Sequence, residues 1–190
     1  MLAAVFSGIT FMFTRFTTLL AGLLFALISS GFASAASNLW TDVPESSIAA
    51  RGTRFVESGV GRTMALNYAA MTDLLHSAPR ESDVAAPDSP FEIALPLPEG
   101  GYGRFRVVES SIMEPELAKR YPMLRTYLGQ GVDNPTATVR FDLTVRGFRA
   151  QVIAATHTTY IEPFQRGDIG NYVVFNKSDY RKQSEPFYCG

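Results

Sequence analysis

The chain has 190 residues and a formal net charge of −1, and this length is enough for one domain with a hydrophobic core. The near-neutral balance of 17 basic and 18 acidic residues gives no electrostatic basis for nucleic-acid binding. Aromatic residues make up 12% of the sequence, with 14 Phe and 8 Tyr, a composition that favours β structure.

The N-terminal segment has the pattern of a secretory signal peptide. Residues 16–32 are mostly apolar, Arg15 precedes them, and Ala33-Ser34-Ala35 supplies small residues in the A-x-A pattern. We predict a signal peptide over residues 1–35, cleaved after Ala35 or one residue later, and therefore a secreted or periplasmic protein. The alternative is a retained membrane anchor, because about 17 apolar residues are the lower limit for a span.

The mature part, residues 36–190, contains the only cysteine, Cys189. No internal disulfide can form, so an exported domain has to depend on its hydrophobic core. Once the signal is removed, we expect no stable insertion in a membrane. The residues before Arg15 are also apolar, which is unusual for a signal peptide, so Met1 and Met12 are both candidate start residues.

The first half of the mature part is predicted to hold one short helix. Residues 36–63 show little periodicity because proline and glycine interrupt them, and we predict an irregular lead-in there. A short strand over 64–66 leads to Asn67, whose side chain can accept a hydrogen bond from a free N–H at a helix start. An amphipathic helix is predicted over 68–77, with apolar residues at helical spacing: Tyr68, Met71, Leu74 and Leu75.

A β-hairpin is predicted after a turn-rich linker over residues 80–90. Residues 91–97 alternate between apolar and other residues, and residues 103–108 follow as the partner strand after a glycine turn. Pro96 cannot donate to a ladder, so the first of these strands is expected at a sheet edge or to end early. The glycines of the turn also invite comparison with a phosphate-binding loop, but no Gly-Lys-Ser/Thr follows them.

The second half of the chain has the sequence pattern of one short helix followed by consecutive β-strands. A short helix is predicted over 113–121, with Pro115 in its first turn. The strands that follow are closely connected, which implies antiparallel pairing, and they are predicted at 124–128, 138–143, 148–154, 158–162 and 171–176. We therefore predict a mainly β (α+β) fold over residues 64–180, an antiparallel sheet or sandwich of about seven strands with one or two short helices, followed by a tail over 181–190.

Four segments occur in a characteristic order along this domain. They are Leu117-Ala-Lys-Arg-Tyr-Pro122, Tyr127-Leu-Gly-Gln-Gly131, Ala137-Thr-Val-Arg-Phe-Asp142 and Tyr160-Ile-Glu-Pro163. The series resembles the N-terminal, propeptide-like domain of secreted bacterial reprolysin-like zinc metalloproteases, which belong to the metzincin class. The resemblance covers about residues 64–180 and implies a domain that accompanies a protease catalytic domain.

The chain departs from the family at the catalytic centre. The family's catalytic helix carries His-Glu-x-x-His-x-x-Gly-x-x-His, in which histidines at i and i+4 bind Zn²⁺ and the Glu acts as base. This chain has two histidines, His76 and His157, and no such motif. The resemblance therefore implies a non-catalytic pro-domain that assists the folding of, or masks, a metalloprotease catalytic domain in cis or in trans. Zinc is expected only in that partner, and the chain is either a truncated product or a stand-alone pro-domain.

The resemblance also gives a candidate role to Cys189. Metzincin prodomains are similar in sometimes using one unpaired cysteine as a switch, whose thiolate takes the open fourth position on zinc and blocks the catalytic water. Cys189 lies after the last predicted strand, where such a segment can reach a following catalytic domain. The alternative is a free terminal cysteine with no role.

Other functions receive less support from the sequence. The main alternative is a secreted β-sandwich binding or adhesion module with no protease partner, and Tyr160, Tyr172 and Phe175 belong either to its partner surface or to the core. An independent enzyme lacks a motif, because Ser110 and Ser111 have no G-x-S-x-G elbow and helix-end and turn positions explain the carboxylates Glu109, Glu114 and Glu116. Asp133, Asp142 and Asp168 do not form the D-x-[DN]-x-[DN]-G loop of a calcium site. His76 is interpreted as an exposed surface residue, and Asn176-Lys-Ser178 fits a glycosylation sequon.

Overall fold

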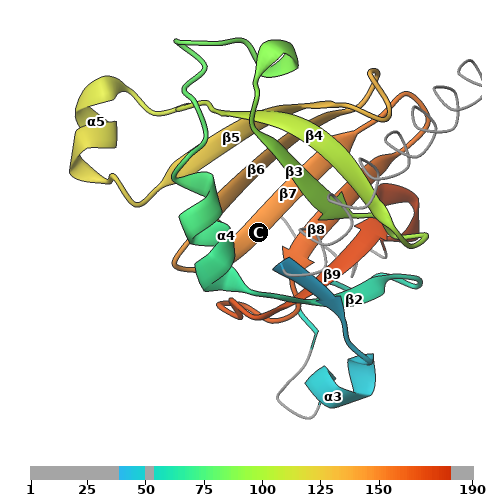
Figure 1. Ribbon diagram of the computed structural model, residues 1–190. Coiled ribbons are helices and arrows are strands. Elements are labelled where there is room, and N and C mark those ends of the chain that lie inside the picture. The colour runs from blue at the N-terminus through green and yellow to red at the C-terminus, as the bar shows by residue number, and fades with distance from the viewer. Residues whose placement is uncertain (1–38, 50–53, 181–190) are drawn as a thin grey trace, which may run out of the picture. The chain divides into compact units, whose positions relative to one another are not determined.

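The computed structural model describes residues 39–49 and 54–180. Within them the chain forms one antiparallel sheet of nine strands in the spatial order β1-β2-β9-β8-β7-β6-β5-β4-β3 (Figure 1). The predicted mainly β, antiparallel fold is confirmed, with nine strands instead of about seven. The predicted signal peptide over 1–35, its cleavage site at Ala35, and Cys189 lie outside the described residues.

The strands are short, and most connections between them are short as well. They are β1 (Trp40–Asp42), β2 (Arg62–Leu66), β3 (Glu92–Pro96), β4 (Tyr102–Glu109), β5 (Arg125–Gly131), β6 (Thr138–Thr144), β7 (Gly147–Ile153), β8 (Thr158–Pro163) and β9 (Asn171–Asn176). The helices that lie wholly in the described part are α3 (Glu45–Ala49), α4 (Tyr68–Leu75) and α5 (Pro115–Arg120), with the 3₁₀ helices η1 (Ala86–Asp88) and η2 (Lys177–Asp179).

Strands β3 to β9 form a meander in which each strand pairs with the next. In β6 the predicted alternation is confirmed, because Val139, Phe141 and Leu143 are buried and the residues between them are not. A two-residue turn joins β6 to β7, and Gly147 follows it with φ of 110°, a backbone conformation that favours glycine. The resulting register places Phe141 opposite Ala150, so the apolar sides of the two strands coincide.

An N-terminal hairpin extends the sheet beyond the last strand of the meander, because β1 pairs with β2 and β2 pairs with β9. The structure therefore differs from the predicted irregular lead-in over 36–63, which contains β1, α3 and the start of β2. β1 has three residues, too few for a recognisable alternation. Its position is fixed by Trp40, which is 1% exposed and makes edge-to-face contacts with Phe148 and Tyr172, with ring centroids 5.4 Å apart in each pair.

Side chains, and not a ladder of backbone hydrogen bonds, join the two ends of the sheet. The guanidinium of Arg62 in β2 holds the Asp42 carboxylate of β1 through two hydrogen bonds of 2.6 and 2.7 Å. Its Nη1 also donates to the carbonyl oxygens of Leu97 and Gly101, at 3.1 and 2.8 Å, in the β3–β4 turn at the other end of the sheet. We call these contacts the Arg62 clasp. The Tyr102 hydroxyl adds a hydrogen bond of 3.2 Å to the first carbonyl of β1.

The main core lies on the inner face of the curved sheet and receives side chains from every strand and from α4. The predicted helix cap is confirmed, because the Asn67 side chain accepts a hydrogen bond of 3.1 Å from the backbone N–H of Ala70. α4 buries Met71 and Leu75 in this core and ends at Leu75, two residues before the predicted end, and His76 is exposed as predicted. Among the helices of the described residues, none is long and apolar enough to cross a membrane.

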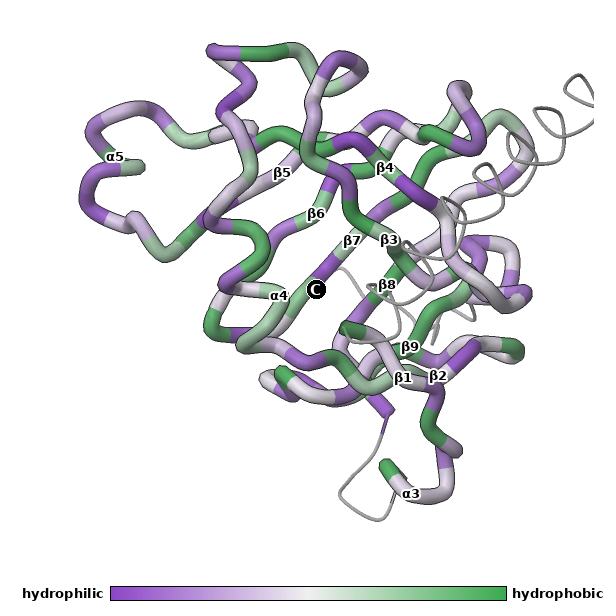
Figure 2. The backbone as a smooth tube through the Cα atoms, in the orientation of Figure 1, coloured by the Kyte–Doolittle hydropathy of each residue, from purple (hydrophilic) through white to green (hydrophobic). Residues whose placement is uncertain are grey.

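A second, smaller core lies on the outer face of β9. Val173 and Phe175 point to this face, where side chains from α3 and from the segment before β2 cover them, whereas Tyr172 and Val174 point to the main core. Figure 2 shows the centre of β9 in the hydrophobic colours. Tyr172 and Phe175 are therefore core residues on opposite faces, and Tyr160 is half-buried and stacks on Phe175 with ring centroids 5.7 Å apart.

Replacing Arg62 by Gln is expected to lower the free energy of unfolding by about 2–4 kcal/mol, because charged hydrogen bonds at a mostly buried side chain are lost. Hydrogen bonding to Arg62 holds the pKa of Asp42 below its usual range. A carboxyl group with a lowered pKa in the folded state stabilises the protein at pH values above its unfolded-state pKa. This contribution is lost as the pH falls through the folded-state pKa. Urea denaturation at neutral and acid pH should show this loss in the wild type and not in Arg62→Gln. Unchanged denaturation midpoints in the variant would contradict the role of the clasp.

Candidate functional site

A 15-residue connection between β4 and β5 departs from the meander, and we call residues 110–124 the excursion. Its ends are fixed by a hydrogen bond of 2.9 Å from the Ser110 N–H to the Thr126 carbonyl, and by one from the Thr126 hydroxyl to the Ser110 carbonyl. Between them, α5 forms with Pro115 in its first turn, as predicted, and Lys119 and Arg120 lie at its C-terminal end, where positive charge is favourable. It spans 115–120, within the predicted 113–121.

The excursion exposes most of its apolar side chains. No residue of α5 is buried, and Figure 1 shows α5 standing away from the strands of the sheet. Eleven large apolar residues of the described part are exposed, and the excursion holds five of them, between 39% and 73% exposed: Ile112, Leu117, Tyr121, Met123 and Leu124. Single exposed apolar residues are ordinary, but five on one segment make the excursion a candidate interaction surface.

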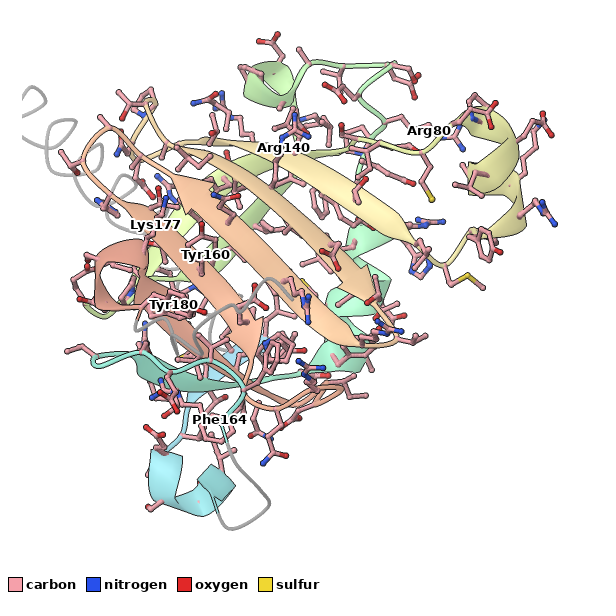
Figure 3. The ribbon with its side chains drawn as sticks, turned by 180° about the vertical axis from the view of Figure 1, so that it is seen from behind. Arg80, Arg140, Tyr160, Phe164, Lys177 and Tyr180 are labelled. Carbon is pink, nitrogen blue, oxygen red and sulfur yellow. The ribbon has the colours of Figure 1, made fainter. Side chains whose placement is uncertain are left out.

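A cleft of about 710 Å³ separates the excursion from the segment at residues 80–82. Met113, Tyr121 and Leu124 line one side of the cleft, and Arg80 and Glu81 line the other. Figure 3 shows Arg80 close to the base of the excursion. An apolar side and a charged side together suit a polypeptide, whose backbone is polar and whose side chains can be apolar.

The end of β4 and the start of β5 form the base of this cleft. The 80–82 segment continues the pairing of β4 at Glu109, because the Glu109 N–H donates to Pro79 and the Glu81 N–H donates to Glu109, at 2.8 and 2.9 Å. Arg125 at the start of β5 lies 3.6 Å from the Glu109 carboxylate. The cleft therefore has a base of paired strands, and hydrogen bonds between Ser110 and Thr126 attach the excursion to it.

A groove of about 320 Å³ lies on the outer face of β5–β8 and shares Ile112 with the excursion. Arg140 and Tyr160 line it, and Figure 3 shows both on this face. The register places Asp142, Arg149 and Glu162 in a row across three strands, with 3.4 Å between the Arg149 and Glu162 side chains. Burial raises the pKa of Asp142 and of Glu162, and Arg149 offsets part of this rise.

The residues considered for calcium and for glycosylation have structural partners in different places. Asp133 pairs with Arg104 at 2.7 Å, and Asp168 accepts hydrogen bonds from the backbone N–H groups of the turn before β9. Asn176 of the sequon donates to Glu99 at 2.7 Å. In residues 39–49 and 54–180 no group of three or more His, Cys, Asp or Glu side chains is placed to hold a metal.

The sequence did not predict that the excursion is exposed. Leu117 and Tyr121 stand at i and i+4, a spacing that indicates one apolar side of a helix but not what covers it. The available signal is the small number of other apolar residues: α5 has six residues, of which Leu117 is the one large apolar residue, and Tyr121 follows directly after the helix, which is too little apolar surface to join a core.

No protein-family model matches the sequence, and no curated protein or solved structure matches the chain.

The double variant Leu117→Ser/Tyr121→Ser is expected to change the free energy of unfolding by no more than about 0.5 kcal/mol, because neither side chain is buried. Phe148→Ala, in the main core, is the comparison and should cost about 3–5 kcal/mol. Urea denaturation of the three proteins measures both values. A cost above about 1 kcal/mol for the double variant would mean that the excursion packs on its own domain.

Asp142→Asn and Asp133→Asn are expected to act in opposite directions. Burial raises the pKa of Asp142, so the folded state holds that proton more tightly and the free energy of unfolding falls as the pH rises between the unfolded- and folded-state pKa values. Hydrogen bonding to Arg104 lowers the pKa of Asp133, so for this residue the free energy of unfolding rises as the pH rises between the folded- and unfolded-state pKa values. At neutral pH, thermal denaturation should show Asp142→Asn as stable as the wild type or more so, and Asp133→Asn as less stable. The same sign in both variants would contradict this assignment.

Proposed function

We propose that this domain is the non-catalytic pro-domain of a secreted zinc metalloprotease, and that it assists the folding of, or masks, the catalytic domain by docking through the excursion. One observation carries the proposal. Leu117 and Tyr121 belong to one of the four segments on which the resemblance rests, and their side chains lie outside the core of their own domain. Packing within the domain therefore does not explain why apolar residues occupy these two positions.

The buried residues of the other three segments are explained by the packing of the domain itself. In the 127–131 segment Tyr127 is buried, and a Cβ added at Gly129 would lie 2.7 Å from the Val139 side chain. A Cβ at Gly131 would lie 2.2 Å from a backbone oxygen, so both positions require glycine. The 137–142 and 160–163 segments supply strands β6 and β8. This contrast supports a contact between the excursion and a second domain.

The chemistry of the excursion suits the centre of a protein–protein interface. Such centres are rich in aromatic and large aliphatic residues, which contribute about 25 cal/mol for each Å² of apolar surface that they bury. Tyr121, Leu117 and Met123 supply this apolar surface, and Arg80 and Lys119 supply a charged rim. A stable interface buries about 1,200–2,000 Å² in total, so the neighbouring cleft and the rim have to take part.

The proposal includes the zinc of the partner and the compartment. Cys189 follows the described domain, and its thiolate would take the open fourth position on the catalytic zinc, at a Zn–S distance of about 2.3 Å. This chain would hold no metal of its own. Export through the signal peptide over 1–35, with cleavage after Ala35, would bring the domain to the secreted or periplasmic space, where its partner acts.

The alternative, a secreted binding or adhesion module with no protease partner, is favoured by the groove on the outer face of β5–β8. Arg140 has no ion-pair partner among the described residues, and the half-buried Tyr160 provides an aromatic surface beside it. A ligand of this groove would contact Arg140 and Tyr160 and would be indifferent to the excursion. The two functions therefore depend on different residues of one domain.

The proposed function predicts that the full-length mature chain slows substrate cleavage by, and binds to, an active catalytic domain from a protease of the resembled family. Leu117→Ser/Tyr121→Ser should weaken binding at least about tenfold, because two apolar side chains at the centre of the interface are removed. Val145→Ser/Ile153→Ser is the matched control, since both residues are exposed and apolar but lie outside the excursion. Calorimetry measures binding, and hydrolysis of a peptide substrate measures inhibition.

Absence of both binding and inhibition would overturn the proposal. Loss of binding in Arg140→Ala/Tyr160→Ala, with none in the excursion variant, would overturn docking through the excursion and place the contact at the outer groove. Cys189→Ala separates the switch from the docking, because it should weaken inhibition and leave binding nearly unchanged. Equal inhibition by Cys189→Ala and the wild type would mean that the cysteine has no role.

A further inference from the structure

The outer face of β6 carries two opposite charges that form no ion pair within residues 39–49 and 54–180. Arg140 and Asp142 stand two residues apart on this strand and point to the same face, about 6.6 Å apart along the backbone. In the same part of the chain neither side chain makes a hydrogen bond. Arg149, which lies opposite Asp142 on β7, is paired with Glu162 at 3.4 Å instead.

The Asp142 carboxylate is half-buried, so water solvates its charge only in part. Burial raises the pKa of Asp142 and of Glu162, and the charge of Asp142 raises the pKa of Glu162 further. The register places these two carboxylates on either side of the single guanidinium of Arg149. A partly buried carboxylate is costly unless it is paired, so a second cation beside this row would be stabilising.

The neighbouring row across the sheet offers hydrogen-bond donors. Arg140 lies opposite Gln151, and Gln151 lies opposite Tyr160. The Tyr160 hydroxyl accepts a hydrogen bond of 3.3 Å from Gln151 Nε2, which leaves its own O–H available to donate. Arg140 and Tyr160 both line the groove, as Figure 3 shows for this face. A guanidinium and a hydroxyl donor together suit a carboxylate, which arginine binds through two parallel hydrogen bonds.

The groove that contains these rows has the volume of one small molecule. Its volume of about 320 Å³ equals that of roughly ten water molecules in the liquid. Ile112, which is 73% exposed, and the ring of Tyr160 add apolar surface. Two basic and two acidic side chains line it, and their charges sum to zero: Arg140, Arg149, Asp142 and Glu162. Separate positive and negative ends favour a ligand of the same kind over a simple cation or anion.

We propose that this groove binds a small zwitterion of the α-amino-acid class with an apolar side chain. The ammonium group lies against Asp142 and Glu162, and the carboxylate lies against Arg140 and the Tyr160 hydroxyl. The two rows are about 6.6 Å apart, a span that one amino acid bridges with hydrogen bonds of about 2.9 Å. The apolar side chain contacts Ile112 and the Tyr160 ring. The site does not rest on the proposed function, because docking through the excursion requires none of these charges.

Calorimetric titration of the full chain with L-phenylalanine tests the class of ligand. We expect a dissociation constant below about 1 mM. N-acetyl-L-phenylalanine lacks the ammonium and L-phenylalaninamide lacks the carboxylate, so each should bind at least about tenfold more weakly. Glycine keeps both charges but lacks the apolar side chain, and it should also bind more weakly. Weaker binding of L-phenylalanine than about 1 mM, or equal binding of either blocked derivative, would overturn the proposal.

Substitutions locate the site. Arg140→Gln and Asp142→Asn should each weaken L-phenylalanine binding at least about tenfold. Arg146→Gln and Asp73→Asn are the matched controls, since both residues are exposed and lie outside the groove, and they should leave binding unchanged. Burial raises the pKa of Asp142, so its asparagine variant should stay folded, and circular dichroism checks this.

Two results would place the ligand or the surface elsewhere. Unchanged binding in both groove variants would mean that L-phenylalanine binds at another position, which overturns the proposal. Sedimentation of the full chain tests whether a second copy covers the groove. A dimer that dissociates in Arg140→Gln and in Asp142→Asn would give these charges a protein partner and would also overturn it.

Discussion

Closure of the curved sheet by side chains is the constraint on which the rest of the structure depends. An antiparallel meander has two edges whose backbone groups require partners, and exposed edges invite pairing with other chains. Here the Arg62 clasp connects β1 and β2 to the β3–β4 turn, and Asn176 adds a hydrogen bond to Glu99 in the same turn. One guanidinium, with donors that point in several directions, thus binds acceptors in β1 and in the β3–β4 turn, two segments that are far apart in the sequence.

Closure also determines where function can be located. Side chains from every strand occupy the inner face, and the outer face of β9 is covered by α3 and the segment before β2. Among the described residues, the cleft beside the excursion and the groove on the outer face of β5–β8 lie outside both cores. The paired strands support the excursion, and no residue of its helix α5 is buried, so the proposed docking residues lie on a connection and not in the core.

The sequence predicted the parts of the fold whose information is local. Alternation placed β6 and β7, and the residue types before and inside α4 placed its cap and its buried side, Met71 and Leu75. β1 and α3 were not predicted, because three or five residues carry no period and Trp40 is held by rings from β7 and β9. Arg62 likewise gives no local signal, since its partners lie 20 to 39 residues away. The helix α5 was predicted correctly, but its exposure depends on what the sheet leaves uncovered.

Trp40 gives the domain an internal optical reporter. It is the only tryptophan in the sequence, it is 1% exposed, and it belongs to the three-residue strand at one end of the sheet. Its emission wavelength therefore reports the polarity at the contact between the N-terminal hairpin and the main core. Far-ultraviolet circular dichroism reports the whole sheet, so a red shift in emission before any change in ellipticity would show the hairpin detaching from an otherwise folded meander.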